Sequence, residues 1–153
     1  MRHDGLWKDI SEKKSSALSL IHGLTHWRRV FENGLIIAKE TGANIKMVEL
    51  FALFHDRCRL NDGKDPDHGN RATQLVASMR SDLLDLPEDL FQDLLEALRD
   101  HTHVRYTDNI HIATCWDADR LDLDRVGETP REEFMNTEVG RTIARKGGTY
   151  GTS

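Results

Sequence analysis

The stretch MVELFALFHD, residues 47–56, joins an almost continuous apolar run to an imidazole and a carboxylate. Asn44 stands just before it and is a favourable N-cap, so we predict a helix over residues 45–56. A carboxylate at the buried end of a helix needs a partner, because burying it unpaired carries a large free-energy cost. We therefore interpret His55 and Asp56 as ligands of a metal ion. The helical period places on one inward face Val48, Phe51, Ala52 and His55.

Helical periods recur on both sides of this stretch, and no strand pattern competes with them. A helix is expected from Thr25, as its N-cap, to Thr41, where Gly42 can adopt the left-handed C-terminal turn. A turn-rich loop then leaves the quoted stretch and ends at Pro66. We predict an all-α fold, a single compact multi-helix domain, whose later helices span 67–80, 87–102 (with Pro87 at the first helical position), 108–123, 130–139 and 140–146.

The length of 153 residues suits one domain that buries roughly two-thirds of its unfolded surface. The patterning divides the chain into an N-terminal segment (1–19), a helical core (20–126), a C-terminal helical extension (127–146) and a flexible tail (147–153). The apolar runs fall far short of the ~20 residues that span a bilayer, and no signal peptide is evident. We expect a cytoplasmic protein with no membrane partner, in which Cys58 and Cys115 are reduced thiols.

The net charge of −5 argues against binding to nucleic-acid backbones. It leaves room for a local basic pocket, because arginines recur near the polar motifs, at positions 57, 59, 71, 99, 105 and 120. Homodimerisation is a further possibility, through Trp7, Trp27 and the weakly patterned ends of the chain.

Further candidate ligands lie on inward helix faces. His26 shares the apolar face of the first helix, and Asp119 lies one turn from Trp116 and Cys115, whereas Asp117 and Asp122 fall off that stripe. A single histidine on an apolar face is more often an ordinary core residue, so the joint arrangement carries the argument. Two imidazoles and two carboxylates suit a divalent cation, namely Mn, Mg, Co, Ni, Zn or Fe. The proposed set is His26, His55, Asp56 and Asp119.

The order of these residues, in the contexts GLTHWRRV (23–30), LFHD (53–56) and DADRLD (117–122), resembles the HD-domain superfamily of metal-dependent phosphohydrolases over residues 20–126. The resemblance implies a helical core of HD-domain type whose quartet binds a divalent cation. It also implies a nucleotide or another small phosphate ester as substrate. His68 and His101 resemble additional histidines of relatives, which hold a second metal or act as acid or base, so we expect one or two ions per chain.

The chain departs from several relatives directly after His55-Asp56. Those relatives carry an acid or a lysine two to four positions later, whereas here Arg57 and Arg59 flank Cys58. We predict that the two arginines bind substrate phosphate, or else pair with Asp62 or Asp65. In the expected mechanism a metal-activated water attacks phosphorus and His68 or His101 protonates the leaving oxygen.

Two other classes of function fit the same residues. The six ligands together resemble the di-iron oxygenase branch of the superfamily, in which iron performs the chemistry. The missing acid after Asp56 instead favours a metal-binding, nucleotide-sensing domain that does not hydrolyse its ligand. The remaining histidines are expected to be structural or exposed, with His103 in a loop, and these are His3, His22, His103 and His111.

Overall fold

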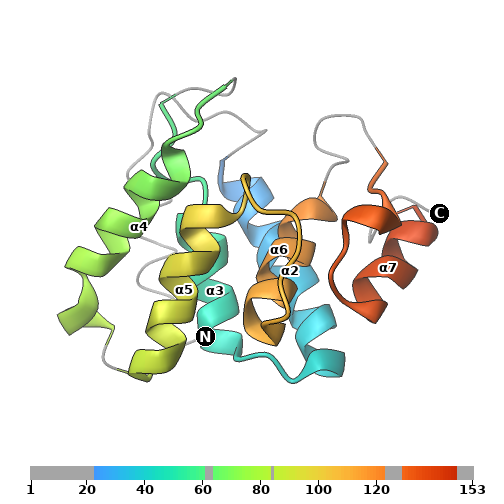
Figure 1. The fold of residues 1–153 in the computed structure, drawn as a ribbon, viewed down its shortest axis with the longest axis horizontal. Helices are drawn as coiled ribbons and strands as arrows, with labels where there is room; N and C mark the ends of the chain where they lie inside the picture. The colour runs from blue at the N-terminus through green and yellow to red at the C-terminus, as the bar shows by residue number, and fades with distance from the viewer. Residues whose placement is uncertain (1–22, 61–63, 84, 123–128, 148–153) are drawn as a thin grey trace.

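The computed structural model describes residues 23–60, 64–83, 85–122 and 129–147, and these residues form helices and no strands. The all-α prediction is confirmed, and the helices pack into a single compact domain (Figure 1). No helix in the described part of the chain combines the length and the apolarity that crossing a membrane requires. The elements are α2 (Leu24–Thr41), α3 (Ile45–Phe54), α4 (His68–Ser78), η1 (Arg80–Asp82), α5 (Glu88–Asp100), α6 (Ile110–Arg120), η3 (Glu132–Phe134) and α7 (Glu138–Arg145).

The predicted caps of α2 and α3 are confirmed in part. Gly42 ends α2 in the left-handed conformation, at φ 78°, as glycine can without strain. Thr25 does not cap α2, because the helix already begins at Leu24 with Gly23 as its N-cap. The Asn44 side chain accepts a hydrogen bond from the Met47 amide at 3.0 Å and so starts α3 as predicted. The helix ends at Phe54, and a turn carries the next two residues.

The later helices are shorter than the periodicity predicts. Pro87 precedes α5 as its N-cap instead of occupying its first turn, and a 3₁₀ turn follows α4 where the helix was expected to continue. Asn109 caps α6 by accepting from the amides of His111 and Ile112. The helix predicted over 130–139 is wrong: only the 3₁₀ turn η3 forms there, because Thr137 takes up the N-cap position of α7 and accepts from the Gly140 amide.

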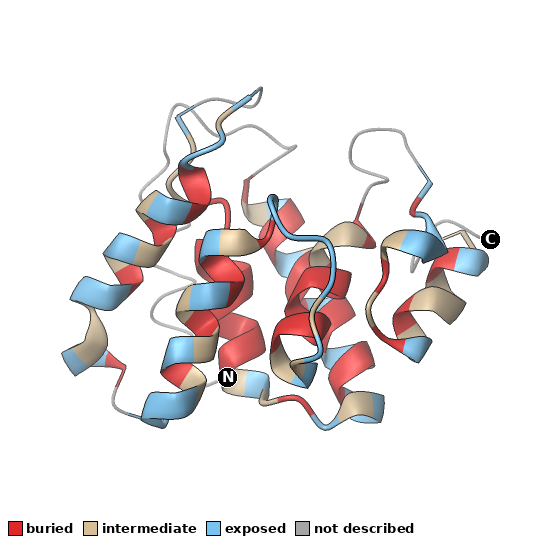
Figure 2. Ribbon diagram, in the orientation of Figure 1, coloured by how far each residue is buried: buried red, intermediate tan, exposed pale blue. Residues whose placement is uncertain are grey.

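Helix α3 lies at the centre of the domain and packs against α2, α5 and α6 (Figure 1). All of its residues from 47 to 54 are buried, which is the packing expected of a helix that is apolar on nearly every side (Figure 2). Helix α4 covers α5, and α7 packs against α2 and α6. Trp27 is only 2% exposed and belongs to this core, so it is not available as an interface residue.

The C-terminal segment is fastened to α6 through Asp117. The prediction that Asp117 and Asp122 lie off the inward stripe is wrong, since both are fully buried. The Asp117 carboxylate accepts from the backbone amides of Asn136 and Thr137, at 2.7 and 2.8 Å, and from the Thr137 hydroxyl at 2.7 Å. Burial raises the pKa of Asp117 even though these donors act in the opposite direction. The polar partners come from a distant segment, which the local helical pattern cannot reveal.

The proposed boundary between core and extension falls within residues 123–128, outside the described residues, and stays a prediction. Residues 1–19 and 148–153 lie outside them as well, as do Trp7, His3 and His22.

We expect Asp117→Ala to lower the free energy of unfolding by about 2–4 kcal/mol, because it leaves three donors without their acceptor in a buried position. Urea unfolding followed by circular dichroism measures the change. Glu96→Ala, at an exposed carboxylate in the interior of α5, is the control and should change stability by less than about 0.5 kcal/mol. An equally small effect at Asp117 would show that the C-terminal segment is not held through this carboxylate.

A glycine lets α4 approach the end of α5. A Cβ atom on Gly69 would stand 2.5 Å from the Leu98 carbonyl oxygen and 3.0 Å from that of Arg99. Gly69→Ala should therefore destabilise the protein by about 1–3 kcal/mol, although alanine is the better helix former. Asn70→Ala, on the exposed side of the same helix, should be neutral or stabilising. Thermal unfolding of both variants tests whether the close approach of α4 to α5 makes the substitution of Gly69 destabilising.

Candidate metal centre

The end of α3 delivers His55 and Asp56 into the interior. His55 is fully buried, and its Nδ1 atom donates to the carbonyl oxygens of Phe51 and Ala52, at 3.1 and 3.2 Å. Because the proton stands on Nδ1, the Nε2 atom of the neutral ring carries a lone pair. That lone pair points away from α3 toward the neighbouring helices. The inward orientation predicted for His55 is confirmed.

Helix α2 places His26 opposite His55. The Nε2 atoms of the two rings lie 3.0 Å apart, and the Nδ1 atom of His26 donates to Asp122 Oδ2 at 2.7 Å. Asp122 also lies 3.3 Å from the Nε atom of Arg29. The sequence pattern missed Asp122, and the available signal was its position three residues after Asp119, where the chain turns back at the end of α6.

Two carboxylates complete what we call the first cluster, made of His26, His55, Asp56 and Asp119. Asp119 Oδ1 lies 3.1 Å from His26 Nε2 and 3.4 Å from His55 Nε2. Asp56 Oδ2 lies 3.4 and 3.5 Å from the same two nitrogens. The four predicted groups therefore converge. The buried Asp119 Oδ1 atom faces these two imidazoles, which can donate to it when they are protonated.

A second cluster consists of Asp56, His68 and His101. The rings of His68 and His101 are buried, and their Nε2 atoms are 2.9 Å apart. Asp56 Oδ1 lies 3.1 Å from the first nitrogen and 3.9 Å from the second. Each Nδ1 atom faces a backbone carbonyl, of Asp65 at 2.6 Å and of Leu98 at 2.8 Å. Asp56 thus stands between the clusters and presents one oxygen to each.

This arrangement fits metal ions. When the rings are neutral, the Nδ1 protons leave Nε2 lone pairs that face each other in both clusters, and two lone pairs about 3 Å apart repel unless a proton or a metal ion lies between them. Ligands that bind one ion at about 2.1 Å and at right angles stand about 3.0 Å from each other. The buried groups His26, His55 and Asp56, and likewise Asp56, His68 and His101, can each hold an ion.

The electrostatics of the first cluster also require positive charge. Burial by itself lowers the pKa of His26, but hydrogen bonds to Asp119, Asp122 and Asp56 outweigh it and raise the pKa to about 10. Burial raises the pKa of Asp119, yet the imidazoles of His55 and His26 hold it well below the usual range. A proton or a metal ion must therefore neutralise these carboxylates.

The two arginines after the pair differ in their contacts. Arg59 donates from Nε to Asp56 Oδ1 at 3.1 Å. The alternative partner Asp65 is instead bound by Arg71, at 2.5 and 2.6 Å from its two oxygens, so the predicted pairing of Arg59 with Asp65 is wrong. Asp62 lies outside the described residues. The Arg57 guanidinium stands 5.9 Å from the centre of the Phe54 ring.

Other titratable side chains stay outside the two clusters. His103 contacts the Pro66 carbonyl at 2.8 Å from an exposed loop, as predicted. His111 accepts from the Asn44 amide at 3.0 Å, which is a structural contact between α6 and the start of α3. Cys58 and Cys115 are both free thiols, and burial raises the pKa of each.

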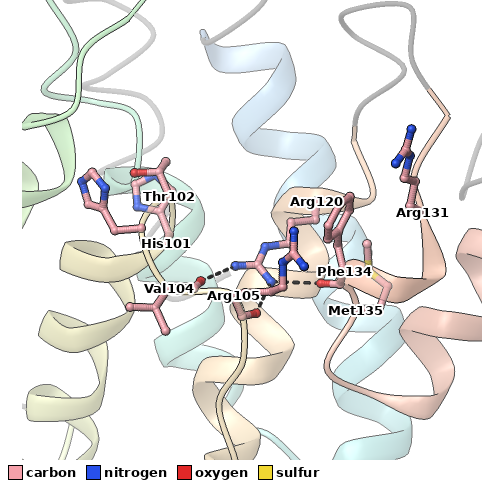
Figure 3. A pocket seen from close by; sticks show the side chains of 9 residues that line it. His101, Thr102, Val104, Arg105, Arg120, Arg131, Phe134 and Met135 are labelled. Atoms are coloured by element: carbon pink, nitrogen blue, oxygen red, sulfur yellow. Dashed lines mark hydrogen bonds between the residues drawn. The ribbon is translucent and has the colours of Figure 1, made fainter.

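A cavity of about 450 Å³ adjoins the second cluster, because His101 belongs to its wall. Figure 3 shows Arg105 and Arg120 between His101 on one side and Phe134 and Arg131 on the other. We call it the arginine cavity. Its lining comes from the segment after α5, the end of α6 and the C-terminal segment, and consists of His101, Thr102, His103, Val104, Arg105, Arg120, Arg131, Phe134 and Met135.

One solved structure shares this architecture, the crystal structure of a predicted HD superfamily hydrolase from an uncultured Thermotogales bacterium. The two chains are 23% identical and superpose with a TM-score of 0.74, over 94% of this chain and 83% of the other. No family model and no curated protein matches the chain. At this identity the likeness establishes the fold, and the fold is the one that the sequence resemblance predicts.

We expect the clusters to lose metal separately. His26→Ala should remove the ion of the first cluster, His101→Ala that of the second, and Asp56→Ala both, because Asp56 faces each histidine pair. Inductively coupled plasma mass spectrometry measures the number of metal ions bound per chain. His103→Ala is the matched control and should keep the full content. If Asp56→Ala retained the content of the unmodified protein, the shared site would be refuted.

Proposed function

We propose that the protein is a metal-dependent phosphohydrolase that acts on a nucleotide or another small phosphate ester in the cytoplasm. The observation that carries the proposal is the convergence of four imidazole Nε2 atoms on the two oxygens of Asp56. Imidazole and carboxylate ligands in a buried pocket are typical of metal centres that activate water. The solved structure with the same fold is itself named as a predicted hydrolase, which supports the same reading.

The proposed ligands are His26, His55, Asp56 and Asp119 for one divalent ion, and Asp56, His68 and His101 for a second. Bound there, a divalent ion supplies a Lewis acid for a phosphoryl oxygen and lowers the pKa of coordinated water. The ligand set accepts Mn, Mg, Co, Ni, Zn or Fe. Asp122 would orient His26, and the Asp65 and Leu98 carbonyls would orient the second pair, since hydrogen bonds to Nδ1 fix the tautomer of a ligating histidine.

The geometry favours a ligand role for His68 and His101 over an acid or base role. Their Nδ1 atoms are held by backbone carbonyls, and their Nε2 atoms face each other and Asp56. Neither ring then has a free nitrogen for the leaving oxygen. Arg57 and Arg59 remain the proposed phosphate partners, because both follow the ligand pair directly and are half-buried. Arg59 would also balance the charge of Asp56, which it already contacts.

A second candidate function is a di-iron oxygenase of the same fold. The observation in its favour is the carboxylate shared between two histidine pairs, since such an arrangement suits a dinuclear centre. Element analysis after anaerobic purification separates the two, because the oxygenase requires two iron atoms per chain. A third candidate, a nucleotide-sensing domain, would bind nucleotides without turnover.

A panel of phosphate esters assayed with added Mn, Co, Ni and Mg tests the proposal. We expect turnover with at least one metal, and we expect His55→Ala to reduce it by about 10³-fold or more together with the metal content. His111→Ala, a histidine outside the clusters, should keep both. A variant that lost its metal and kept full activity would rule the mechanism out. If no compound in the panel is hydrolysed but a nucleotide still raises the melting temperature, the result would favour the nucleotide-sensing domain.

A further inference from the structure

The arginine cavity holds positive charge that the metal centre does not use. Three guanidinium groups line it, from Arg105, Arg120 and Arg131. They come from three separate parts of the chain, so no single helix pattern accounts for their convergence. The net charge of the whole chain is −5, so three cations with no acid among the described lining residues form an unusual local concentration of positive charge.

No carboxylate among the described residues forms a salt bridge with Arg105 or Arg131. Both guanidinium groups contact aromatic rings instead. The centre of the Phe134 ring lies 4.4 Å from the Arg105 guanidinium and 5.9 Å from that of Arg131, and the centre of the Tyr106 ring lies 5.9 Å from that of Arg105. A guanidinium gains little from an aromatic face at an exposed site, on the order of 1 kcal/mol. Both groups therefore retain most of their capacity to bind an anion through paired N–H donors.

Arg120 forms the fixed part of the wall. Its guanidinium donates to the backbone carbonyls of Val104, Arg105 and Phe134, at 2.7, 2.7 and 3.0 Å. These acceptors are neutral, so the charge of Arg120 is not cancelled by them. Because one of these carbonyls belongs to Arg105 itself, the Arg120 side chain holds the backbone from which the Arg105 guanidinium extends into the same cavity wall.

The cavity adjoins the metal centre through one residue. His101 lines the cavity and also belongs to the second cluster, and Arg120 directly follows Asp119 of the first cluster in α6. The arginines therefore lie on the far side of a residue that the cavity and the second cluster share. Val104, Phe134 and Met135 supply apolar walls, and a partly dehydrated wall strengthens charge pairing. The volume of about 450 Å³ is larger than one phosphate needs and suits a small-molecule fragment.

We propose that the arginine cavity binds a second anionic group of the substrate, one that is not cleaved. The substrate class is then a small phosphate ester that carries another phosphate or a carboxylate on a short carbon skeleton. This inference rests on the proposed function for the cleaved group, whereas the second group is recognised by Arg105 and Arg131. Arg120 is a positioning residue, because it holds the backbone of both flanking segments.

Two matched pairs of compounds test the proposal and separate the two anions. Adenosine 3′,5′-bisphosphate is compared with adenosine 5′-monophosphate, and 3-phosphoglycerate with glycerol 3-phosphate. We expect kcat/KM to favour the member with the second anion by about tenfold or more in at least one pair. Arg131→Gln and Arg105→Gln should each reduce that preference by about tenfold, chiefly through KM, since binding of the uncleaved group is lost.

Arg145→Gln is the matched control. It removes an exposed arginine of the same C-terminal segment that pairs with Glu132 and does not line the cavity, so the preference should persist. Circular dichroism checks that all variants fold, which is expected because Arg105 and Arg131 are both exposed.

The two proposals can fail independently. Hydrolysis of both members of each pair at equal rates, or a preference that survives both cavity variants, would overturn the second-anion site and leave the phosphohydrolase intact. If the metal-loaded protein hydrolyses none of the four compounds, calorimetric titration compares their binding directly. Binding that favours the second anion and depends on Arg131 would then support the cavity while the phosphohydrolase fails. Equal binding would overturn the cavity.

Discussion

The carboxylate of Asp56 is the group on which both clusters depend. One of its oxygens faces His26 and His55, and the other faces His68 and His101. A buried anion surrounded by four imidazoles is stable only with compensating positive charge, and Arg59 supplies part of it. Two of those imidazoles, His26 and His68, belong to helices α2 and α4. The other two, His55 and His101, directly follow helices α3 and α5. The packing of these helices therefore also brings the residues of the site together.

The sequence predicts the helical class and the first cluster well, for a physical reason. Helix α3 is apolar on nearly every side, and its stripe of Val48, Phe51 and Ala52 predicts the inward direction of His55 from the pattern alone. Asn44 and Gly42 act locally and are predicted by local chemistry. The resemblance to the HD superfamily then implies the order of the quartet, and the solved structure shares the fold that the resemblance implies.

The features that sequence reasoning missed depend on distant partners. Asp117 looked like a surface residue of α6, but its acceptor oxygens are used by backbone amides twenty residues later. Asp122 follows the end of α6 and turns inward to His26, which no helical period describes. The helix expected over 130–139 fails because Thr137 caps α7 and competes with continuation of a helix through it. For Asp117 and Asp122 a hydrogen bond across the fold outweighs the local pattern, and for Thr137 a helix cap does.

The position of α4 has a consequence for how the two clusters would bind metal ions. The first cluster is built by α2, α3 and α6, which pack against one another in the core, whereas His68 belongs to α4, whose main packing partner is α5. If two ions bind as proposed, their sites would be unequal, because the ligands of the first cluster come from helices that already pack together, whereas the second site would also have to hold α4 in place. An ion bound by the second cluster would link α4 to the core through His68. The occupancy of this site would then control how often α4 separates from the core. The supply of metal in the cell would thereby influence the local rigidity of the protein.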